Sequence, residues 1–240
     1  MIKNILAIDT STPRTFVAFY TDSGTLVERS SSGTTSHSEE LAELVQQAIG
    51  GGAAAGLRAL VIGSGPGSFT GLRIGYSFLK GVSFALQIPL CSVCSLEGMA
   101  REAPANAALI ACASDARRGE LFTAFFRRNN EGRLVREPVA AILGYPEAQE
   151  KLKRMQADYL VPAPQVAVVC DSDQTAGHFE AVHGWTIQRT AALAAQLAGI
   201  YCEQQPNPQP YDLAALACQE PTYVRPVAAR TITERMRSSR

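Results

Sequence analysis

The sequence predicts an α/β protein made of two successive units, each a mixed sheet with helices packed on it. Three short strands open the chain, and alternating helices and strands follow them. The same order of elements begins again after Pro104, as in a duplicated architecture. The length of 240 residues corresponds to between one and two domains at about 150 residues per domain.

The first unit opens with a meander of three strands. They are expected at residues 2–10, 15–20 and 25–31. The segments STPR and TDSG between them are typical of turns, because their proline, glycine, serine and aspartate residues favour turn conformations.

A helix over residues 36–49 follows the meander. Ser36 and Glu39 have the spacing of a capping box, and apolar residues then recur at helical spacing until the glycines at 50–52 end the helix. The remaining expected elements of this unit are a strand at 57–62, a glycine-rich loop at 63–71, a helix at 72–86 and a strand at 89–94.

The second unit repeats this order. Its expected elements are strands at 108–113, 121–127 and 134–140, a helix at 145–156, a strand at 166–170 and a helix at 190–203. We divide the chain into an N-terminal unit, 1–104, and a C-terminal unit, 105–210, which ends in a proline-rich linker. The segment 211–227 is expected to pack back on the first unit, and 228–240 to form a flexible basic tail.

The composition excludes several classes of protein. Hydrophobic residues make up 46% and charged residues only 18%, against about 25% in ordinary domains, so the chain can bury a substantial core. Lys+Arg and Asp+Glu balance at 22 each, which leaves no overall field to attract nucleic acid. No apolar run reaches the ~18 residues of a membrane span, and the start does not resemble a signal peptide. We therefore expect a cytoplasmic protein without a membrane partner.

The six cysteines are irregularly spaced, which favours reduced thiols over a disulfide framework. Cys91 and Cys94 have CxxC spacing but fall on an expected strand, where residues three apart point to opposite faces. We interpret them as small core residues. A redox or metal-binding module would require the two thiols to converge.

The segment GSGPGSFTGLRIG at residues 63–75 is the strongest local signal, since it lies between an expected strand and helix, where open α/β sheets bind ligands. It fits neither phosphate-binding template, because Leu72 stands where the Walker loop requires Lys and the dinucleotide pattern requires a further glycine. Two interpretations remain open: the loop cradles an anion or nucleotide, or its glycines permit a tight turn and close helix contact. The residues of such a nucleotide or anion loop would be Asp9, Gly65, Gly67, Ser68 and Thr70.

Other chemistry-bearing residues give weaker signals. Asp9 ends the first strand, where a carboxylate holds a metal or water in some enzymes and caps a turn in others. His37 is interpreted as a helix-start histidine, and His178 and His183 as surface residues. The sequence contains no GxSxG, HExxH or kinase signature, so autonomous catalysis is poorly supported.

The helix at 72–86 is apolar on two sides and leaves a narrow polar strip at Arg73, Ser77 and Lys80. Such a helix must be covered on both sides. The sheet can cover one side, so a neighbouring helix or another protein is expected on the other.

Four segments carry a resemblance to a known family: AIDTST near the start, GPGSFTGLRIG at 65–75, SDARRGELF at 114–122 and EPTYVR at 220–225. Together they resemble the TsaB (YeaZ) family of bacterial tRNA-modification proteins. The resemblance extends over nearly the whole chain. It implies two tandem actin-like (ASKHA, ribonuclease H-like) subdomains, and a role in making threonylcarbamoyladenosine next to the anticodon of tRNAs.

The resemblance also implies that this chain is not an enzyme. In such systems a related subunit, TsaD, carries out the transfer and holds a metal with an HxxxH motif. Ser95 and Met99 stand at the corresponding positions here, and a hydroxyl and a thioether cannot replace two imidazoles. We therefore expect a scaffold that binds no metal there and no cofactor of its own, with ATP used by the complex.

The partners that the resemblance implies are TsaD, the ATPase TsaE and, through the complex, tRNA. TsaD would bind through helices 36–49 and 72–86, and the isolated chain would form a homodimer through the same surface. We expect the chain alone to bind tRNA weakly. The candidate partner-binding residues are Leu41, Leu44, Val45, Leu72, Gly75, Tyr76 and Leu79.

An alternative from another class is a free-standing actin-like ATP-binding phosphotransferase, with Asp9 and the loop at 65–70 around the nucleotide. The role of the DARRGEL segment also stays open. Asp115, Arg117 and Glu120 either hold a hairpin together by ion pairing or contact a partner.

Overall fold

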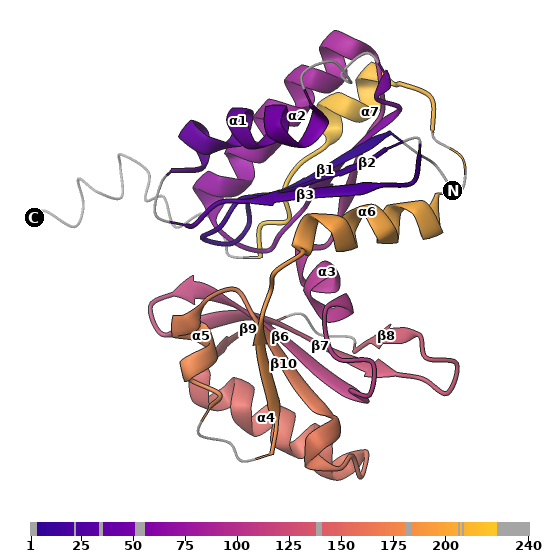
Figure 1. Cartoon of the computed structure of the whole chain (residues 1–240). Helices are drawn as coiled ribbons and strands as arrows, with labels where there is room; N and C mark the ends of the chain where they lie inside the picture. The colour runs from indigo at the N-terminus through magenta and orange to yellow at the C-terminus, as the bar shows by residue number, and fades with distance from the viewer. Residues whose placement is uncertain are drawn as a thin grey trace, which may run out of the picture.

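Two sheets, each covered by helices, form the two halves of the molecule, one above the other in Figure 1. The prediction of two successive mixed α/β units is confirmed. The computed structural model describes residues 4–21, 23–33, 36–50, 56–137, 141–180, 184–205, 207 and 209–224.

The first sheet has the strand order β3-β2-β1-β4-β5, with β2 antiparallel and β4 parallel to the central strand β1. Its strands are β1 (Ile5–Asp9), β2 (Phe16–Tyr20), β3 (Leu26–Ser30), β4 (Ala59–Gly63) and β5 (Leu90–Val93). One face packs on α1 (His37–Ile49) and α2 (Phe69–Leu86) through an apolar cluster that includes Leu6 and Ile8. Because side chains alternate along a strand, Ile5 and Ala7 lie on the other face.

The second sheet has the order β11-β10-β6-β7-β8, and β9 pairs with β7 beyond this path. Its strands are β6 (Leu109–Arg117), β7 (Glu120–Arg128), β8 (Leu134–Arg136), β9 (Ala141–Gly144), β10 (Val166–Cys170) and β11 (Thr186–Arg189). The helices of this half are α4 (Tyr145–Asp158), a 3-10 turn (Ala163–Gln165) and α5 (Asp173–Gly177).

The two sheets correspond strand by strand. In each, the central strand is antiparallel to the following strand and parallel to a later one: β1 to β2 and β4, β6 to β7 and β10. The edge strands β3 and β8, and β5 and β11, complete the correspondence. This repeated topology supports a duplicated origin that residue-by-residue comparison of the halves does not reveal.

The seam between the halves consists of α3 (Ser95–Arg101) and α6 (Leu193–Gln204). One apolar cluster includes residues of both sheets and of both helices, so the halves share a core. The sequence division grouped α6 with the second unit, but this helix packs on β1 and β2 of the first sheet. The chain returns to the first half before the proline-rich linker, because the apolar face of α6 completes the covering of that sheet.

Several element boundaries differ from the sequence predictions. The capping box at α1 is not formed: Ser36 is the N-cap, but its hydroxyl contacts Ser38 and accepts no helix amide. Helix α2 begins at Phe69 because Ser68 caps it, three residues before the expected start. Five short elements were not expected from the sequence: α3, β9, α5, β11 and the 3-10 turn.

The C-terminal segment lies on the first half. Helix α7 (Leu213–Cys218) contacts α2, where the Lys80 ammonium donates a hydrogen bond to the Ala217 carbonyl. The expected basic tail, the arginines at 225 and beyond, and His183 lie outside the described residues. Among the helices described, none is both long and apolar enough for a membrane span. All six cysteines are free, and Cys94 follows the end of β5 as the N-cap of α3 instead of lying on the strand.

Candidate functional site

Asp9 ends β1 and is completely buried. Its Oδ1 accepts hydrogen bonds from the Ser11 amide (2.8 Å) and hydroxyl (2.6 Å), and its Oδ2 accepts one from the Ser95 hydroxyl (2.6 Å). Burial raises the pKa of this carboxyl, and the hydrogen bonds from the two serines oppose that shift. Both oxygens are therefore engaged by the chain itself.

The glycine-rich segment packs tightly against the loop that follows Asp9. A Cβ atom on Gly67 would stand 2.2 Å from the Ser11 carbonyl oxygen, and one on Gly71 would stand 2.1 Å from that of Thr10. On Gly75 it would lie 2.4 Å from the Thr10 hydroxyl. These contacts favour the interpretation that the glycines permit close helix contact.

The N-terminus of α2 is capped from within the same segment. The Ser68 hydroxyl accepts a hydrogen bond from the Gly71 amide (3.1 Å), and the Ser68 amide donates one to the Ser11 carbonyl (2.7 Å). The N-cap serine thus joins the start of α2 to the loop after β1.

A cavity of about 690 Å³, the central pocket, opens between the halves beside this helix terminus. Both halves and the C-terminal segment contribute to its wall. Asp9 and Gly65 are not among the residues that line it, while Gly67, Ser68 and Thr70 are. Its lining residues are Ser11, Thr12, Pro13, Gly33, His37, Gly67, Ser68, Phe69, Thr70, Asp115, Ala116, Arg117, Phe122, Asp171, Thr222, Tyr223 and Val224.

His37 fixes the first-half wall of the central pocket. Its Nδ1 lies 2.7 Å from the Thr15 hydroxyl, and burial lowers the pKa of the imidazole. The imidazole ring joins the start of α1 to the loop before β2. This contact agrees with the interpretation of His37 as a structural histidine at a helix start.

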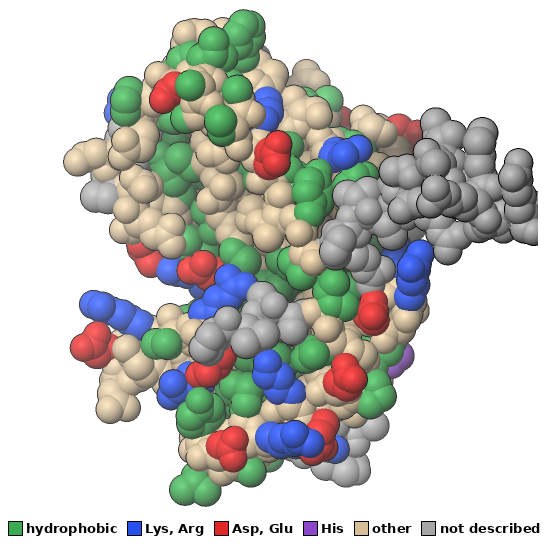
Figure 2. Space-filling model, turned by 180° about the vertical axis from the view of Figure 1, so that it is seen from behind, with side chains coloured by type: hydrophobic (Ala, Val, Ile, Leu, Met, Phe, Trp, Pro, Cys, Tyr) green, Lys and Arg blue, Asp and Glu red, His purple; other side chains and the backbone are tan. Residues whose placement is uncertain are grey.

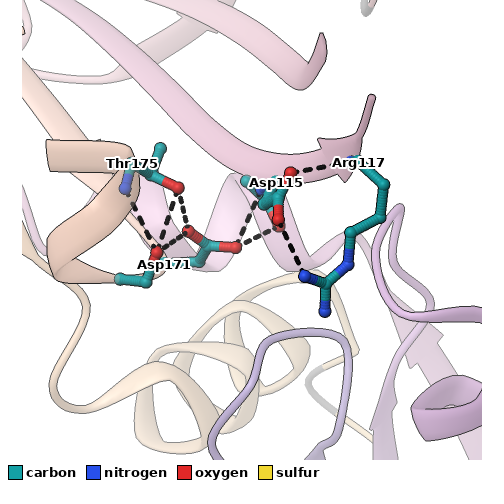
Figure 3. A network of polar contacts seen from close by, with 6 residues as sticks. Asp115, Arg117, Asp171 and Thr175 are labelled. Carbon is teal, nitrogen blue, oxygen red and sulfur yellow. Dashed lines mark hydrogen bonds and ion pairs between the residues drawn. The ribbon is translucent and has the colours of Figure 1, made fainter. Parts of the chain in front are cut away.

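The second-half wall is organised by a buried carboxylate, Asp171, that the sequence analysis missed (Figure 3). Its Oδ2 accepts hydrogen bonds from the Ser114 hydroxyl and the Asp115 amide, both at 2.9 Å. Its Oδ1 accepts from the hydroxyls of Thr175 (2.7 Å) and Ser172 (3.0 Å). An aspartate directly after an apolar strand, as in VAVVCD, is the signal that could have found it.

Asp115 connects this hydrogen-bond network to the tip of the β6–β7 hairpin. Its Oδ1 accepts the Arg117 amide at 2.7 Å, and its Oδ2 lies 3.3 Å from the guanidinium, whose side chain is 81% exposed (Figure 3). Arg117 and Arg118 both have left-handed backbone conformations, with φ of 64° and 60°. The Asp115–Arg117 ion pair thus belongs to the hairpin, and both residues also line the central pocket.

Comparison with known proteins identifies the family of this fold. A model of the family described as TsaD, tRNA N6-adenosine threonylcarbamoyltransferase, matches residues 29–224. The TsaB protein of Escherichia coli, described as a tRNA threonylcarbamoyladenosine biosynthesis protein, is 31% identical over 160 residues, which cover 65% of this chain and 69% of that protein. The chain belongs to the TsaB (YeaZ) family.

Solved structures agree with this assignment. YeaZ from Pseudomonas aeruginosa superposes with a TM-score of 0.68 at 22% identity, over 93% of this chain and all of that one. A second Pseudomonas aeruginosa structure, described as similar to peptidase YEAZ, has a TM-score of 0.70 at 23% identity and the same coverage. The TsaB fold therefore extends over nearly the whole chain.

Ser95 and Met99 both make internal contacts in this TsaB-family chain. Ser95 donates its hydroxyl to Asp9, and Met99 is buried in the shared core. Among the described residues, no cluster of His, Cys, Asp or Glu could hold a metal ion.

Most of the candidate partner-binding residues lie inside the chain's own core, so the expectation that they form an exposed surface is wrong. Tyr76 is only 3% exposed, and Leu44 alone of the set is half-buried. The first sheet and helix α1 together cover the side of α2 on which Tyr76 lies. The buried members are Leu41, Val45, Leu72, Gly75, Tyr76 and Leu79.

Proposed function

We propose that this chain is a non-catalytic scaffold subunit that binds and activates a TsaD-type transferase during threonylcarbamoyladenosine synthesis on tRNA. Its relatives are named for that biosynthesis. The complex would work in the cytoplasm with the ATPase TsaE and would use ATP, and tRNA would be contacted through the complex. One observation carries the scaffold role: α2 exposes an apolar surface that the other described residues leave uncovered.

That surface, the α2 apolar patch, consists of Phe84, Leu86 and the neighbouring α7 residue Leu213. Phe84 is 59% exposed, Leu86 38% and Leu213 56%, and α7 contacts α2. Hydrophobic side chains gather at the upper edge of the first half in Figure 2. Contiguous exposed apolar groups typically mark protein interaction sites. We therefore propose this patch as the partner-binding surface in place of the buried residues that the sequence suggested.

The same patch would support a homodimer of the isolated chain. Removal of large apolar groups from water drives association of either kind. Binding of TsaD and self-association would then exclude each other, because both would cover Phe84.

The phosphotransferase alternative is less well supported. Asp9, its expected metal or water ligand, has both oxygens engaged and does not line the central pocket. Of the two glycines expected to cradle phosphate, Gly67 lies against the loop after β1, and a Cβ atom on Gly65 would stand 2.9 Å from the Leu72 side chain. ATP turnover by the isolated chain, lost in an Asp9→Asn variant that still folds, would restore this alternative.

The scaffold proposal is tested by Phe84→Asp, with Leu160→Asp as its control. Leu160 is 87% exposed in the second half, so the control makes the same change outside the patch. We expect the affinity for TsaD to fall at least about tenfold for Phe84→Asp, since loss of a central aromatic typically costs about 2 kcal/mol. The control should keep wild-type affinity. Equal affinity of both variants would remove the patch from the interface.

A further inference from the structure

The chain crosses between the halves at two described places, and one side chain contacts both. The first crossing leaves α3 at Glu102 and leads to β6, and the second runs from β11 to α6 through Thr190, Ala191 and Ala192. Glu102 belongs to the first crossing and binds the second.

Three hydrogen bonds join the Glu102 carboxylate to the second crossing, and a fourth joins its backbone to β11. Its Oε2 accepts from the amides of Ala191 (2.6 Å) and Ala192 (3.1 Å), and its Oε1 accepts from the Thr190 hydroxyl. Its backbone carbonyl accepts from the Gln188 amide group at 2.7 Å. The carboxylate thereby also satisfies free amides at the start of α6, where a negative charge is favourable.

The remaining contact between α3 and α6 is mainly apolar. A Cβ atom on Gly98 would stand 2.7 Å from Cδ1 of Leu193 and 2.9 Å from Cδ2 of Leu197, so the two helices touch closely. Apolar contacts have no directional preference, and packed helices can slide past each other by small amounts. Hydrogen bonds to a carboxylate depend on angle and are about twice as strong as neutral ones.

A second polar link joins the same helices but not the two crossings. Arg101 and Glu203 form a paired contact at 2.6 Å near the C-terminal end of α6. The Glu203 side chain is 62% exposed, and solvent-exposed pairs contribute little. Of these two polar links, only the bonds that Glu102 makes hold the two crossings to each other.

We propose that Glu102 is a latch that fixes the angle between the two halves, and with it the width of the central pocket. The central pocket has walls from both halves, so rotation at the crossings changes its opening. Without the carboxylate the shared apolar core stays in place, but the hydrogen bonds between the two crossings are lost. The halves then sample a range of angles.

The test compares Glu102→Ala and Glu102→Gln with Glu203→Gln as the matched control. Spin labels on non-natural residues at Gln46 of α1 and Lys153 of α4, both exposed, report the distance between the halves without use of the free cysteines. Wild type and Glu203→Gln should give one narrow distance distribution. Glu102→Ala should give a clearly broader one, and Glu102→Gln, which keeps an acceptor, an intermediate one.

Hydrogen exchange supplies a local readout. The Ala191 and Ala192 amides should exchange about tenfold faster in Glu102→Ala, since hydrogen bonds to a charged group are the stronger kind. Faster exchange with an unchanged distance distribution would overturn the latch and leave only a helix cap. If Glu102→Ala does not fold, Glu102→Gln decides: a broadened distribution supports the latch, and a wild-type distribution overturns it.

Discussion

Gly63 lies directly against the carboxylate of Asp9. A Cβ atom on Gly63 would stand 1.8 Å from Oδ2 of Asp9 and 2.7 Å from the Ser95 hydroxyl. The parallel pairing of β1 with β4 sets Ile8 opposite Ile62, and the next residue of each strand is Asp9 and Gly63. The buried carboxylate therefore occupies the space that a side chain on β4 would need.

This relationship predicts that Gly63→Ala is strongly destabilising. The added methyl group meets an enclosed carboxylate that cannot move aside, so we expect a loss of about 3 kcal/mol in the free energy of unfolding. Gly81→Ala is the control, because Gly81 lies in α2 with nothing near its Cβ position, and should gain up to about 1 kcal/mol. Urea denaturation checks both. If Gly63→Ala lost no more free energy of unfolding than an average surface substitution, the close contact between Gly63 and Asp9 would be contradicted.

The alternation of apolar residues and the turn chemistry were enough to predict the order of the main strands and helices, because both are local properties. The short elements were missed for the same reason. Helix α3 has seven residues and β11 has four, and neighbours from distant parts of the chain stabilise both. The pairing of Asp9 with Ser95 joins residues 86 positions apart, which no local pattern reveals.

The pKa of Asp9 predicts a pH dependence of stability. Burial raises it above its value in the unfolded chain, 3.8, so the folded state binds more protons than the unfolded state above that value. The contribution of Asp9 is fully present below pH 3.8 and is lost as the pH rises through the raised pKa. The free energy of unfolding of wild type relative to Asp9→Asn should therefore fall as the pH rises from 4 to 7. A difference between the two proteins that is constant or increases with pH would contradict this assignment.

The burial of Tyr76 predicts that Tyr76→Asp destabilises the isolated chain. A carboxylate placed among the side chains of the first-half core has no partner there, and we expect a loss of about 3 kcal/mol or more. Ser77→Asp, on the exposed side of the same helix, should change stability by about 0.5 kcal/mol or less. Thermal unfolding compares them. An unchanged thermal midpoint for Tyr76→Asp would show that Tyr76 is not part of the core.

Asp171 predicts a second strong effect. In Asp171→Asn an NH2 group replaces one of the two accepting oxygens. Some of the groups that donate to the carboxylate, the Ser114 and Thr175 hydroxyls and the Asp115 backbone amide, then lose their acceptor. We expect a loss of about 3 kcal/mol. Asp173→Asn, two residues on with its side chain 80% exposed, is the control and should lose about 1 kcal/mol or less. Similar denaturation midpoints for the two variants would show that the network does not hold the hairpin.

The candidate partner surface shows where sequence periodicity reaches its limit. The pattern identified α2 as apolar on two sides, but it did not reveal which side the chain covers. Tyr76 and Phe84 are both aromatic and lie on one helix, yet they are 3% and 59% exposed. Tyr76 belongs to the apolar cluster that α2 forms with α1 and the sheet, whereas Phe84 does not.

We propose that the chain activates a separate transferase and performs no transfer itself. The most direct measurement is the rate of threonylcarbamoyl transfer to tRNA by TsaD and TsaE with wild-type chain, with Phe84→Asp, with Leu160→Asp and without the chain. We predict full stimulation by wild type and Leu160→Asp, and at most about a tenth of that stimulation at limiting concentrations of Phe84→Asp. A rate without the chain equal to the rate with it, or transfer by the chain in the absence of TsaD, would overturn the scaffold role.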